Sequence, residues 1–367
     1  MVVLLICSFV VALVSIVFVV RLGKKYGKHY DHAKPQRFHA GNVPRLGGLG
    51  ILAGLVVGWL VADWGGVFGM QLNIQADTAP AWKWIVVIIP AVAGGILEDM
   101  TQRLSVHYRL ALTALSAGLA CGLLGLAVQR IGVIGVDNWM VAMPWAGVAL
   151  GFVAICGLPH AFNLIDGYNG LAGSVALMVC LAIAHVALQL GDRHLAAMII
   201  CLAGATFGFL LWNYPRGLIF AGDGGAYLWG VVISVASILL VQRHEQVSPW
   251  FPMLLLIYPV WETVFSIYRK LVRGTSPGVA DSLHFHQLIY RRIVRGVFHD
   301  DAARHMLMRN NRTSPYLWGF TLLTVVPAVL FWNNTPVLMI VCALFIIGYI
   351  VGYIAIIRFK IPRWLRR

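Results

Sequence analysis

The sequence contains few charged residues. Of its 367 residues only 11% are Asp, Glu, Lys or Arg, whereas 60% are hydrophobic. A water-soluble globular protein carries about 25% charged residues, because polar side chains cover its surface. Soluble enzymes and soluble binding modules are therefore excluded, and the chain is expected to reside in a membrane.

The apolar runs also lack polar alternation. Strands of outer-membrane barrels alternate apolar and polar residues over about ten positions, whereas 2–20 and 337–357 are almost continuously apolar. A membrane-spanning helix needs about 20 such residues, so we expect an all-α polytopic membrane protein. Eleven spans are predicted, at 2–20, 46–62, 82–97, 110–128, 144–162, 171–190, 195–212, 226–241, 249–267, 316–333 and 336–357.

Acidic residues are half as frequent as basic ones, 14 against 28, which gives a net charge of +14. In a soluble protein this excess would indicate nucleic-acid binding. Membrane topology explains it better, because eleven spans place 24 of the 28 Lys and Arg residues on one side. The positive-inside rule makes that side cytoplasmic, with the N-terminus outside and the C-terminus inside. No nucleic-acid partner is expected.

Cysteines are few and show no metal-site spacing. All six fall within apolar runs, so they are interpreted as small buried hydrophobic residues, and no disulfide framework is expected. The sequence has no internal repeats, and its longest polar connection is 268–315. We therefore expect one integral membrane domain, 1–367, with 268–315 as a long cytoplasmic loop.

Polar residues that hydropathy does not require gather at the predicted cytoplasmic ends of the spans. The clusters are Glu98-Asp99, the segment Asn163 to Gly170, Gly222-Asp223-Gly224-Gly225 and His284-Phe285-His286. Segments distant in the sequence thus converge on one membrane face, which is typical of a functional site.

Each cluster also has a simpler interpretation. Glu98 and Asp99 could equally be a solvated helix end, although the nearby Arg103 and Arg109 suit a site for metal and phosphate. Asp-Gly and Asn-Gly pairs are common in turns, and a glycine-rich run is weak evidence for phosphate binding. The His-x-His pair lacks the further ligands of a zinc site. Glu262 is the one acid well inside a span, with either an arginine of the following loop as partner or a role in a substrate pathway.

Taken in order, these segments resemble the motifs of the polyprenyl-phosphate N-acetylhexosamine-1-phosphate transferases. Pro44-Arg45-Leu46-Gly47-Gly48 is similar to the P-x-x-G-G of that family. Glu98-Asp99 stands at its paired aspartates, and Asn163 to Leu171 matches N-x-x-D-G-x-D/N-G-L. Gly222 to Gly225 matches G-D-x-G, and His284 to Gln287 resembles H-x-H-H. The layout is similar to the common-antigen type, which has eleven spans, whereas lipid I synthases have ten.

The resemblance implies transfer of a sugar 1-phosphate from a UDP-sugar to undecaprenyl phosphate, which releases UMP. It also implies a Mg²⁺ cofactor, with Mn²⁺ as an alternative, contact with membrane lipids and a homodimer. The reaction would initiate O-antigen or another surface glycan at the cytoplasmic face of a bacterial inner membrane.

Site residues follow from the same resemblance. Asp223 and Asn163 would bind Mg²⁺, and Asp99 would deprotonate or orient the attacking lipid phosphate. Asp166 would support the metal or nucleotide site, and Asn169 would lie near the uridine. The remaining implied residues are Glu98, Gly222 and the phosphate contacts Arg103, Arg109, His284 and His286.

Three positions depart from the motifs of the family. Glu98 replaces the first aspartate of the pair and is one methylene longer. Asn169 removes a charge, and Gln287 replaces the last histidine, so neither a carboxylate at 169 nor an imidazole at 287 is needed in this protein.

The main alternative function is a flippase or another transporter of lipid-linked saccharides. Transporters commonly have related halves, broken helices and charges near the bilayer midplane. The clustering of charges at one face, without a repeat, favours the enzyme. A purely structural anchor would explain neither the clusters nor their sidedness.

Overall fold

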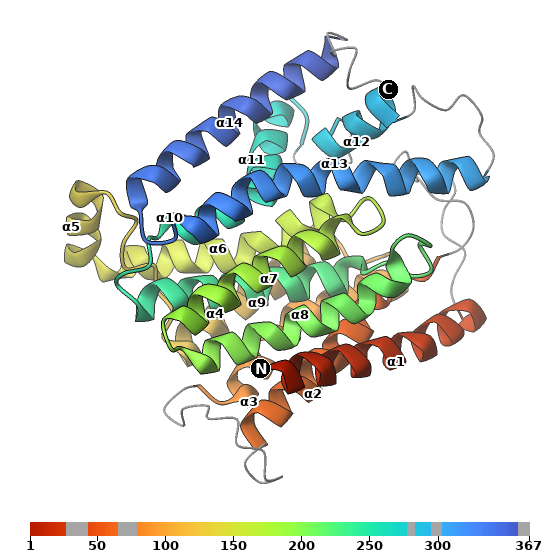
Figure 1. Ribbon diagram of the computed structural model, residues 1–367, viewed down its shortest axis with the longest axis horizontal. Helices are drawn as coiled ribbons and strands as arrows, with labels where there is room; N and C mark the ends of the chain where they lie inside the picture. The colour runs from red at the N-terminus through yellow and green to blue at the C-terminus, as the bar shows by residue number, and fades with distance from the viewer. Residues whose placement is uncertain (27–42, 65–78, 277–282, 295–302, 359–367) are drawn as a thin grey trace.

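The computed structural model describes residues 1–26, 43–64, 79–276, 283–294 and 303–358, and within these residues it contains helices and no strand. Most of the long helices run side by side in one bundle (Figure 1). This arrangement confirms the all-α membrane fold. The helices are α1 (Val2–Tyr26), α2 (Gly47–Trp64), α3 (Ala81–Thr101), α4 (Val106–Leu124), α5 (Ile134–Ala142), α6 (Pro144–Ile165), α7 (Leu171–Gln189), α8 (Arg193–Asn213), α9 (Gly222–Arg243), α10 (Trp250–Leu255), α11 (Ile257–Val272), α12 (Phe285–Ile289), the π-helix η1 (Tyr290–Val294), α13 (Ala303–Leu330) and α14 (Thr335–Ile357).

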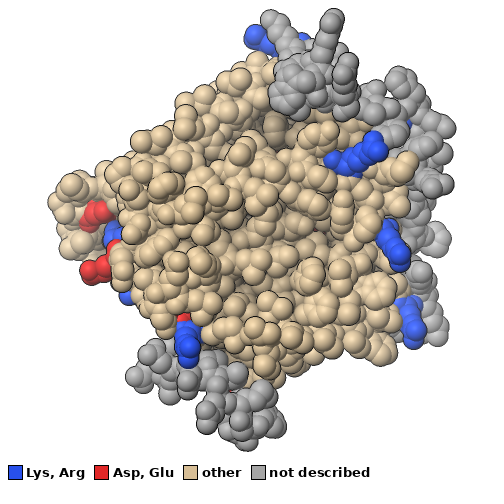
Figure 2. Space-filling model, in the orientation of Figure 1, with Lys and Arg blue, Asp and Glu red and all other residues tan. Residues whose placement is uncertain are grey.

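Ten of these helices are long and apolar enough to cross a membrane. They are α1, α2, α3, α4, α6, α7, α8, α9, α13 and α14, and each coincides with a span predicted from the sequence. A helix satisfies its backbone hydrogen bonds internally, which is required where no water is present. In Figure 2 the centre of the visible face carries no charged side chain, and the charged groups lie toward its edges.

The span expected at 249–267 forms two helices instead of one. α10 ends before Leu256, and Pro259 has no N–H to donate to the carbonyl of Leu255, which explains the interruption. The Ser248 hydroxyl lies 2.7 Å from that of Thr335 at the start of α14, and Arg269 donates to the Tyr353 hydroxyl near its end. The pair α10–α11 therefore contacts α14 near both of its ends, but neither helix is among the ten that are long and apolar enough to cross a membrane, so the described residues do not confirm the eleventh span.

The connection expected at 268–315 is largely helical in its described part. α11 continues to Val272, α12 and η1 follow, and α13 begins at Ala303. The short helices bury apolar side chains such as Leu288 and Ile293 against the bundle. Hydropathy did not predict these helices, because they contain polar or charged residues and lie outside the long apolar runs.

Helix α5 was also missed, because its nine residues are too few to cross a bilayer. The carboxylate of Asp137 accepts hydrogen bonds from the backbone N–H groups of Ile131 and Gly132, at 2.6 and 3.0 Å. This contact closes the turn that leads from α4 into α5.

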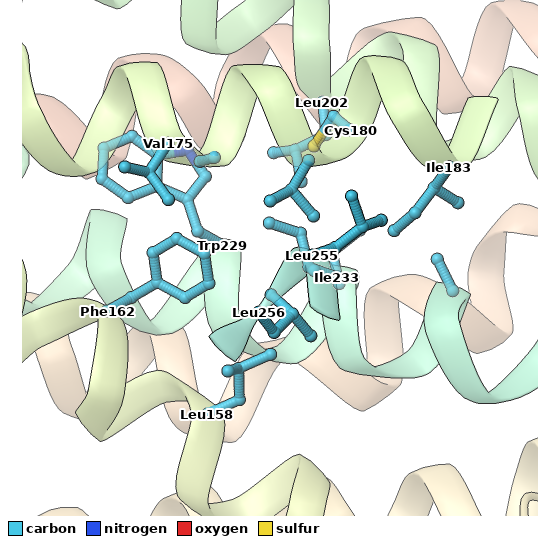
Figure 3. Close-up of a cluster of buried hydrophobic side chains, with 14 of the residues drawn as sticks. Leu158, Phe162, Val175, Cys180, Ile183, Leu202, Trp229, Ile233, Leu255 and Leu256 are labelled. Atoms are coloured by element: carbon cyan, nitrogen blue, oxygen red, sulfur yellow. The ribbon is translucent and has the colours of Figure 1, made fainter. Parts of the chain in front are cut away.

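Helix α9 lies at the centre of the bundle and is buried along almost its whole length. It packs against α3 and α6, and α2 covers another part of it. The Trp229 ring lies beside Phe162 in an apolar cluster that also includes residues of α7, α8 and α10 (Figure 3). Because α9 is held on several sides, the residues at its first turn have a fixed position.

Candidate active site

Two glycine motifs hold α2 against the start of α9. The N–H groups of Gly47 and Gly48 donate to the carbonyls of Phe220 and Ala221, at 2.8 and 2.9 Å. A Cβ atom at Gly48 would collide with the backbone N of Gly225. The P-x-x-G-G and G-D-x-G motifs are therefore two sides of one close backbone contact.

Helix α3 approaches α9 equally closely. A Cβ atom at Gly95 would lie only 2.6 Å from the carbonyl carbon of Asp223. Gly222 has φ +71°, a left-handed conformation that favours glycine, and a Cβ there would meet Asp99 and the carbonyl of Arg45. These contacts bring the acid at the end of α3 to the first turn of α9.

The Asp99 side chain is 1% exposed and binds the start of α9. One carboxylate oxygen accepts the N–H of Asp223 and the other accepts the N–H of Gly224, both at 2.9 Å. The first N–H groups of a helix have no partner within the helix, and a negative charge stabilises them. Asp99 therefore fixes the backbone that carries Asp223.

Asp223 is the most densely contacted acid of this cluster, with 5% of its side chain exposed. Arg109 donates to Oδ2 at 2.7 Å, and the Asn163 amide donates to Oδ1 at 2.8 Å. Arg45 donates to Oδ1 at 3.4 Å, and the Tyr227 hydroxyl reaches Oδ2 at 3.5 Å. Two acids, Asp99 and Asp223, are thus balanced by two arginines.

Arg45 lies between the two acids, with Nε 3.9 Å from Asp99 and Nη2 3.4 Å from Asp223. Neither Arg45 nor Tyr227 is among the site residues predicted from the sequence. Arg45 lies inside the P-x-x-G-G motif on the side where the acids gather. Tyr227 follows Asp223 by four residues, which places both on one helix face.

Asp166 follows α6 and is partly buried beside this cluster. Burial raises the pKa of its carboxyl from 3.8 to about 7, with Asp223 adding to the rise and Arg45 opposing it. A carboxyl in this state exchanges its proton near neutral pH and readily accepts a neighbouring cation.

Asn169 is fully buried and forms part of a hydrogen-bonded amide cluster. Its backbone N–H donates to Asn310 at 2.8 Å, and its side-chain NH₂ donates to Asn311 at 3.0 Å. The Ser314 hydroxyl donates to its carbonyl. Helix α13 therefore fixes the end of the N-x-x-D-G-x-N motif, and contact between Asn169 and uridine stays a prediction. Sequence motifs gave no signal for these α13 residues.

His284 and His286 are buried, with 4% and 1% exposed. Their rings stack with centroids 5.5 Å apart, and the His286 ring meets the edge of Tyr168 at 5.6 Å. Burial lowers the pKa of His286 to about 3, and Glu262 and His284 have smaller, opposing effects. The neutral His286 imidazole packs against the residues that follow Asp166, and phosphate contacts of both histidines stay a prediction.

Glu98 and Arg103 also lie outside the Asp99–Asp223 pair. Glu98 accepts the backbone N–H of Leu104 at 2.8 Å and so closes the turn between α3 and α4. Arg103, in that turn, is exposed. Phosphate binding by Arg103 stays a prediction, whereas Arg109 lies directly on Asp223.

The oxygen donors of this cluster fit a Mg²⁺ ion. Carboxylate and amide oxygens are suitable ligands, and Asp223 and Asn163 carry one group of each kind, although the contact between them in this structure is made by the Asn163 NH₂ group and not by its oxygen. Among the described residues, no three His, Cys, Asp or Glu side chains gather around a metal position. Mg²⁺ commonly uses one or two protein carboxylates together with substrate phosphates, so this small ligand set suits a metal–diphosphate complex.

Comparison with known proteins agrees with these features. The sequence profile described as Glycosyl transferase family 4 matches residues 81–241, which include Asp99, Asn163 and Asp223. A phospho-N-acetylmuramoyl-pentapeptide-transferase of Rubrobacter xylanophilus is 30% identical over 281 residues, which cover 69% of this chain and 79% of that protein.

Two further relatives carry a different sugar in their names. A probable undecaprenyl-phosphate N-acetylglucosaminyl 1-phosphate transferase of Bacillus subtilis is 28% identical over 80% of this chain and 79% of its own. An undecaprenyl-phosphate alpha-N-acetylglucosaminyl 1-phosphate transferase of Escherichia coli K12 is 26% identical over 78% and 76%. The chain therefore belongs to glycosyl transferase family 4, within the polyprenyl-phosphate N-acetylhexosamine-1-phosphate transferases, as its motifs predicted.

Proposed function

We propose that this protein transfers an N-acetylhexosamine 1-phosphate from a UDP-sugar to undecaprenyl phosphate. A phosphate oxygen of the lipid attacks the phosphorus that carries the sugar, and a new P–O bond forms. The bond from that phosphorus to the oxygen bridging to the UMP phosphate breaks, and UMP leaves with that oxygen. The products are undecaprenyl-diphosphate-sugar and UMP.

The observation that carries this proposal is the cluster of Asp99, Asp223, Arg45 and Arg109 at one end of an apolar helix bundle. Cations next to carboxylates can bind a diphosphate and a divalent ion together. The apolar helices around the cluster supply the hydrocarbon surroundings that a polyprenyl chain needs. A water-soluble donor and a membrane-bound acceptor can meet at such a place.

In the proposed reaction, the rate acceleration comes from neutralising charge on the phosphates and from positioning the reactants. Mg²⁺, held by Asp223 and Asn163, would neutralise charge on the diphosphate. Arg45 and Arg109 would exchange part of their contact with Asp223 for the phosphate oxygens of the donor. Asp166, with a pKa of about 7, would hold a proton or support the ion.

Asp99 has a more specific role in this proposal. Because both of its oxygens accept backbone N–H groups of α9, it orients Asp223 toward the diphosphate. The alternative role, deprotonation of the lipid phosphate, would use the second lone pair of one of these oxygens, because each oxygen accepts only one of the two N–H bonds.

The cellular setting follows from the same proposal. The site would face the cytoplasm of a bacterial inner membrane, where UDP-sugars are made, with the N-terminus on the opposite side. The product would start O-antigen or another surface glycan.

UMP release by the purified protein in detergent tests the reaction. The assay uses undecaprenyl phosphate, Mg²⁺ or Mn²⁺, and UDP-GlcNAc, UDP-GalNAc, UDP-FucNAc, UDP-QuiNAc or UDP-N-acetylmuramoyl-pentapeptide. We expect UMP only when lipid, metal and one class of donor are all present. UMP without lipid, or UMP that persists in EDTA, would contradict the proposal.

A further inference from the structure

A second polar cluster lies deep in the bundle around Glu262 of α11. This side chain is 0% exposed. One carboxylate oxygen accepts the backbone N–H of Phe285 at 3.0 Å, and the other accepts the Tyr349 hydroxyl at 2.8 Å. A buried carboxylate is tolerated only with such partners, because losing its hydration is costly.

The cluster is connected to the His-x-His segment. His284 Nδ1 lies 3.3 Å from the Glu262 oxygen that binds Phe285. A single carboxylate oxygen therefore faces both the backbone of this segment and its first imidazole. Glu262 is fully buried, and its partners among the described residues are a tyrosine, a histidine and a backbone N–H, whereas the sequence suggested an arginine.

A second set of contacts, two turns further along α11 and one turn further along α14, holds the same segment. Arg269 donates to the carbonyl of Leu283 and to the Tyr353 hydroxyl, both at 2.9 Å. Tyr353 also donates to the carbonyl of Leu283, at 3.2 Å. Glu262 and Arg269 on α11, with Tyr349 and Tyr353 on α14, thus hold residues 283–285 from two sides.

The held segment touches the candidate active site through its second histidine. The His284 and His286 rings stack, and His286 packs on the Tyr168 ring. A Cβ atom at Gly167 would lie 3.3 Å from His286 Nε2, so the imidazole covers the glycine directly after Asp166. A displacement at His284 would therefore reach the N-x-x-D-G motif through ring contacts.

We propose that Glu262, anchored by Tyr349, is a positioning residue that sets the His284–His286 segment against Gly167 and Tyr168. It acts through His284 and touches no substrate. This inference rests on the proposed transferase function, because its consequence is a lower turnover. Its structural part can be measured independently of turnover.

Glu262→Gln is the main test variant, because it keeps the side-chain shape but replaces one acceptor oxygen by an NH₂ group. We expect kcat for UMP release to fall about 10- to 100-fold, while the KM for the UDP-sugar changes less than about threefold. Tyr349→Phe removes one hydrogen bond to Glu262 but keeps the hydrogen bond between Glu262 and the Phe285 N–H, so kcat should fall less. Glu245→Gln, at an exposed acid after α9, is the matched control and should behave as wild type.

A double-mutant cycle separates positioning from general destabilisation. His284→Asn alone should lower kcat to a similar degree, and adding Glu262→Gln should lower it little further, because both changes remove one pathway. Multiplicative losses in the double variant would overturn the inference. Normal kcat in folded Glu262→Gln would overturn it as well.

Amide hydrogen exchange over residues 283–289 provides the readout without turnover. We expect faster exchange there in Glu262→Gln, and in Tyr349→Phe if the first variant fails to fold, with Glu245→Gln unchanged. If the wild-type protein releases no UMP but the variants show this exchange pattern, the proposed function is wrong and the structural role of Glu262 stands. Unchanged exchange in both variants would remove the inference, whatever the activity of the wild type.

Discussion

The carboxylate of Asp99 accepts the backbone N–H groups of both Asp223 and Gly224, each at 2.9 Å. The acid at the end of α3 thereby fixes the first turn of α9, the helix that carries Asp223. Asp99 and Asp223 are 124 residues apart in the sequence, yet they form one unit. A change at Asp99 should therefore act on the proposed metal site through Asp223.

Asp99→Asn should weaken this unit, because an amide has one acceptor oxygen and its NH₂ group would face a backbone N–H. We expect kcat to fall about 100-fold, with a small change in the KM for UDP-sugar. The Mg²⁺ concentration for half-maximal activity should rise. An unchanged Mg²⁺ requirement together with an altered pH profile would instead identify Asp99 as a proton acceptor.

Asp223→Asn removes the carboxylate that Arg45, Arg109 and Asn163 contact. UMP release should drop by at least about 1000-fold, since charge neutralisation at the diphosphate is lost. Steady-state rates over a range of Mg²⁺ concentrations measure this. Near-wild-type rates would exclude Asp223 from the metal site.

Gly48→Ala tests the close contact between α2 and α9. Its Cβ atom would meet the backbone of Gly225, which cannot move aside easily, so we expect a loss of about 1–3 kcal/mol and of most activity. Gly122→Ala in α4 is the matched control, because a Cβ there has no neighbour within 4 Å. Thermal unfolding in detergent compares them, and equal Tm values would contradict the packing described here.

The buried His286 predicts a pH-dependent stability. Its folded pKa of about 3 lies below its ordinary 6.5, so the unfolded chain binds the proton first as pH falls. The stabilisation that His286 contributes is complete above about pH 6.5 and declines progressively toward about pH 3. The Tm difference between wild type and His286→Asn should therefore shrink from pH 7.5 to pH 5.

The effect of His286 must be measured against the His286→Asn variant, because the ionisation of Asp166 changes stability with pH in the opposite direction. Its folded pKa of about 7 lies above its ordinary 3.8, so its carboxyl disfavours the folded state more as pH rises between these values. That contribution is common to wild type and His286→Asn. A Tm difference that is constant with pH would show that His286 is not buried as neutral imidazole.

Hydropathy predicted eleven spans, and ten of them coincide with helices of the described residues that are long and apolar enough to cross a membrane. Ten long apolar helices lie where runs such as 2–20 predict them, because a bilayer requires both length and apolarity. It could not predict the interruption at Leu256 or the helix α5. Local hydrogen bonding and tertiary contacts, such as that of Asp137 with its own turn, determine these features.

Motifs predicted which segments meet but not how they are connected. Asp99, Asn163 and Asp223 were expected on one face, and hydrogen bonds join them there. The contacts of Asn169 with α13 and of Glu262 with Tyr349 join segments that are distant in the sequence. Such pairs leave no local pattern, so a single sequence cannot reveal them.

Following the phosphorus atom tests the central claim most directly. The purified protein would be given undecaprenyl phosphate, Mg²⁺ and the preferred UDP-sugar, labelled with ³²P at the phosphate that carries the sugar. Sugar 1-phosphate transfer predicts that the label enters the lipid fraction in amounts equal to the UMP released. Label that stays in UDP while the sugar reaches the lipid, or label that never leaves the donor in folded protein, would contradict the account.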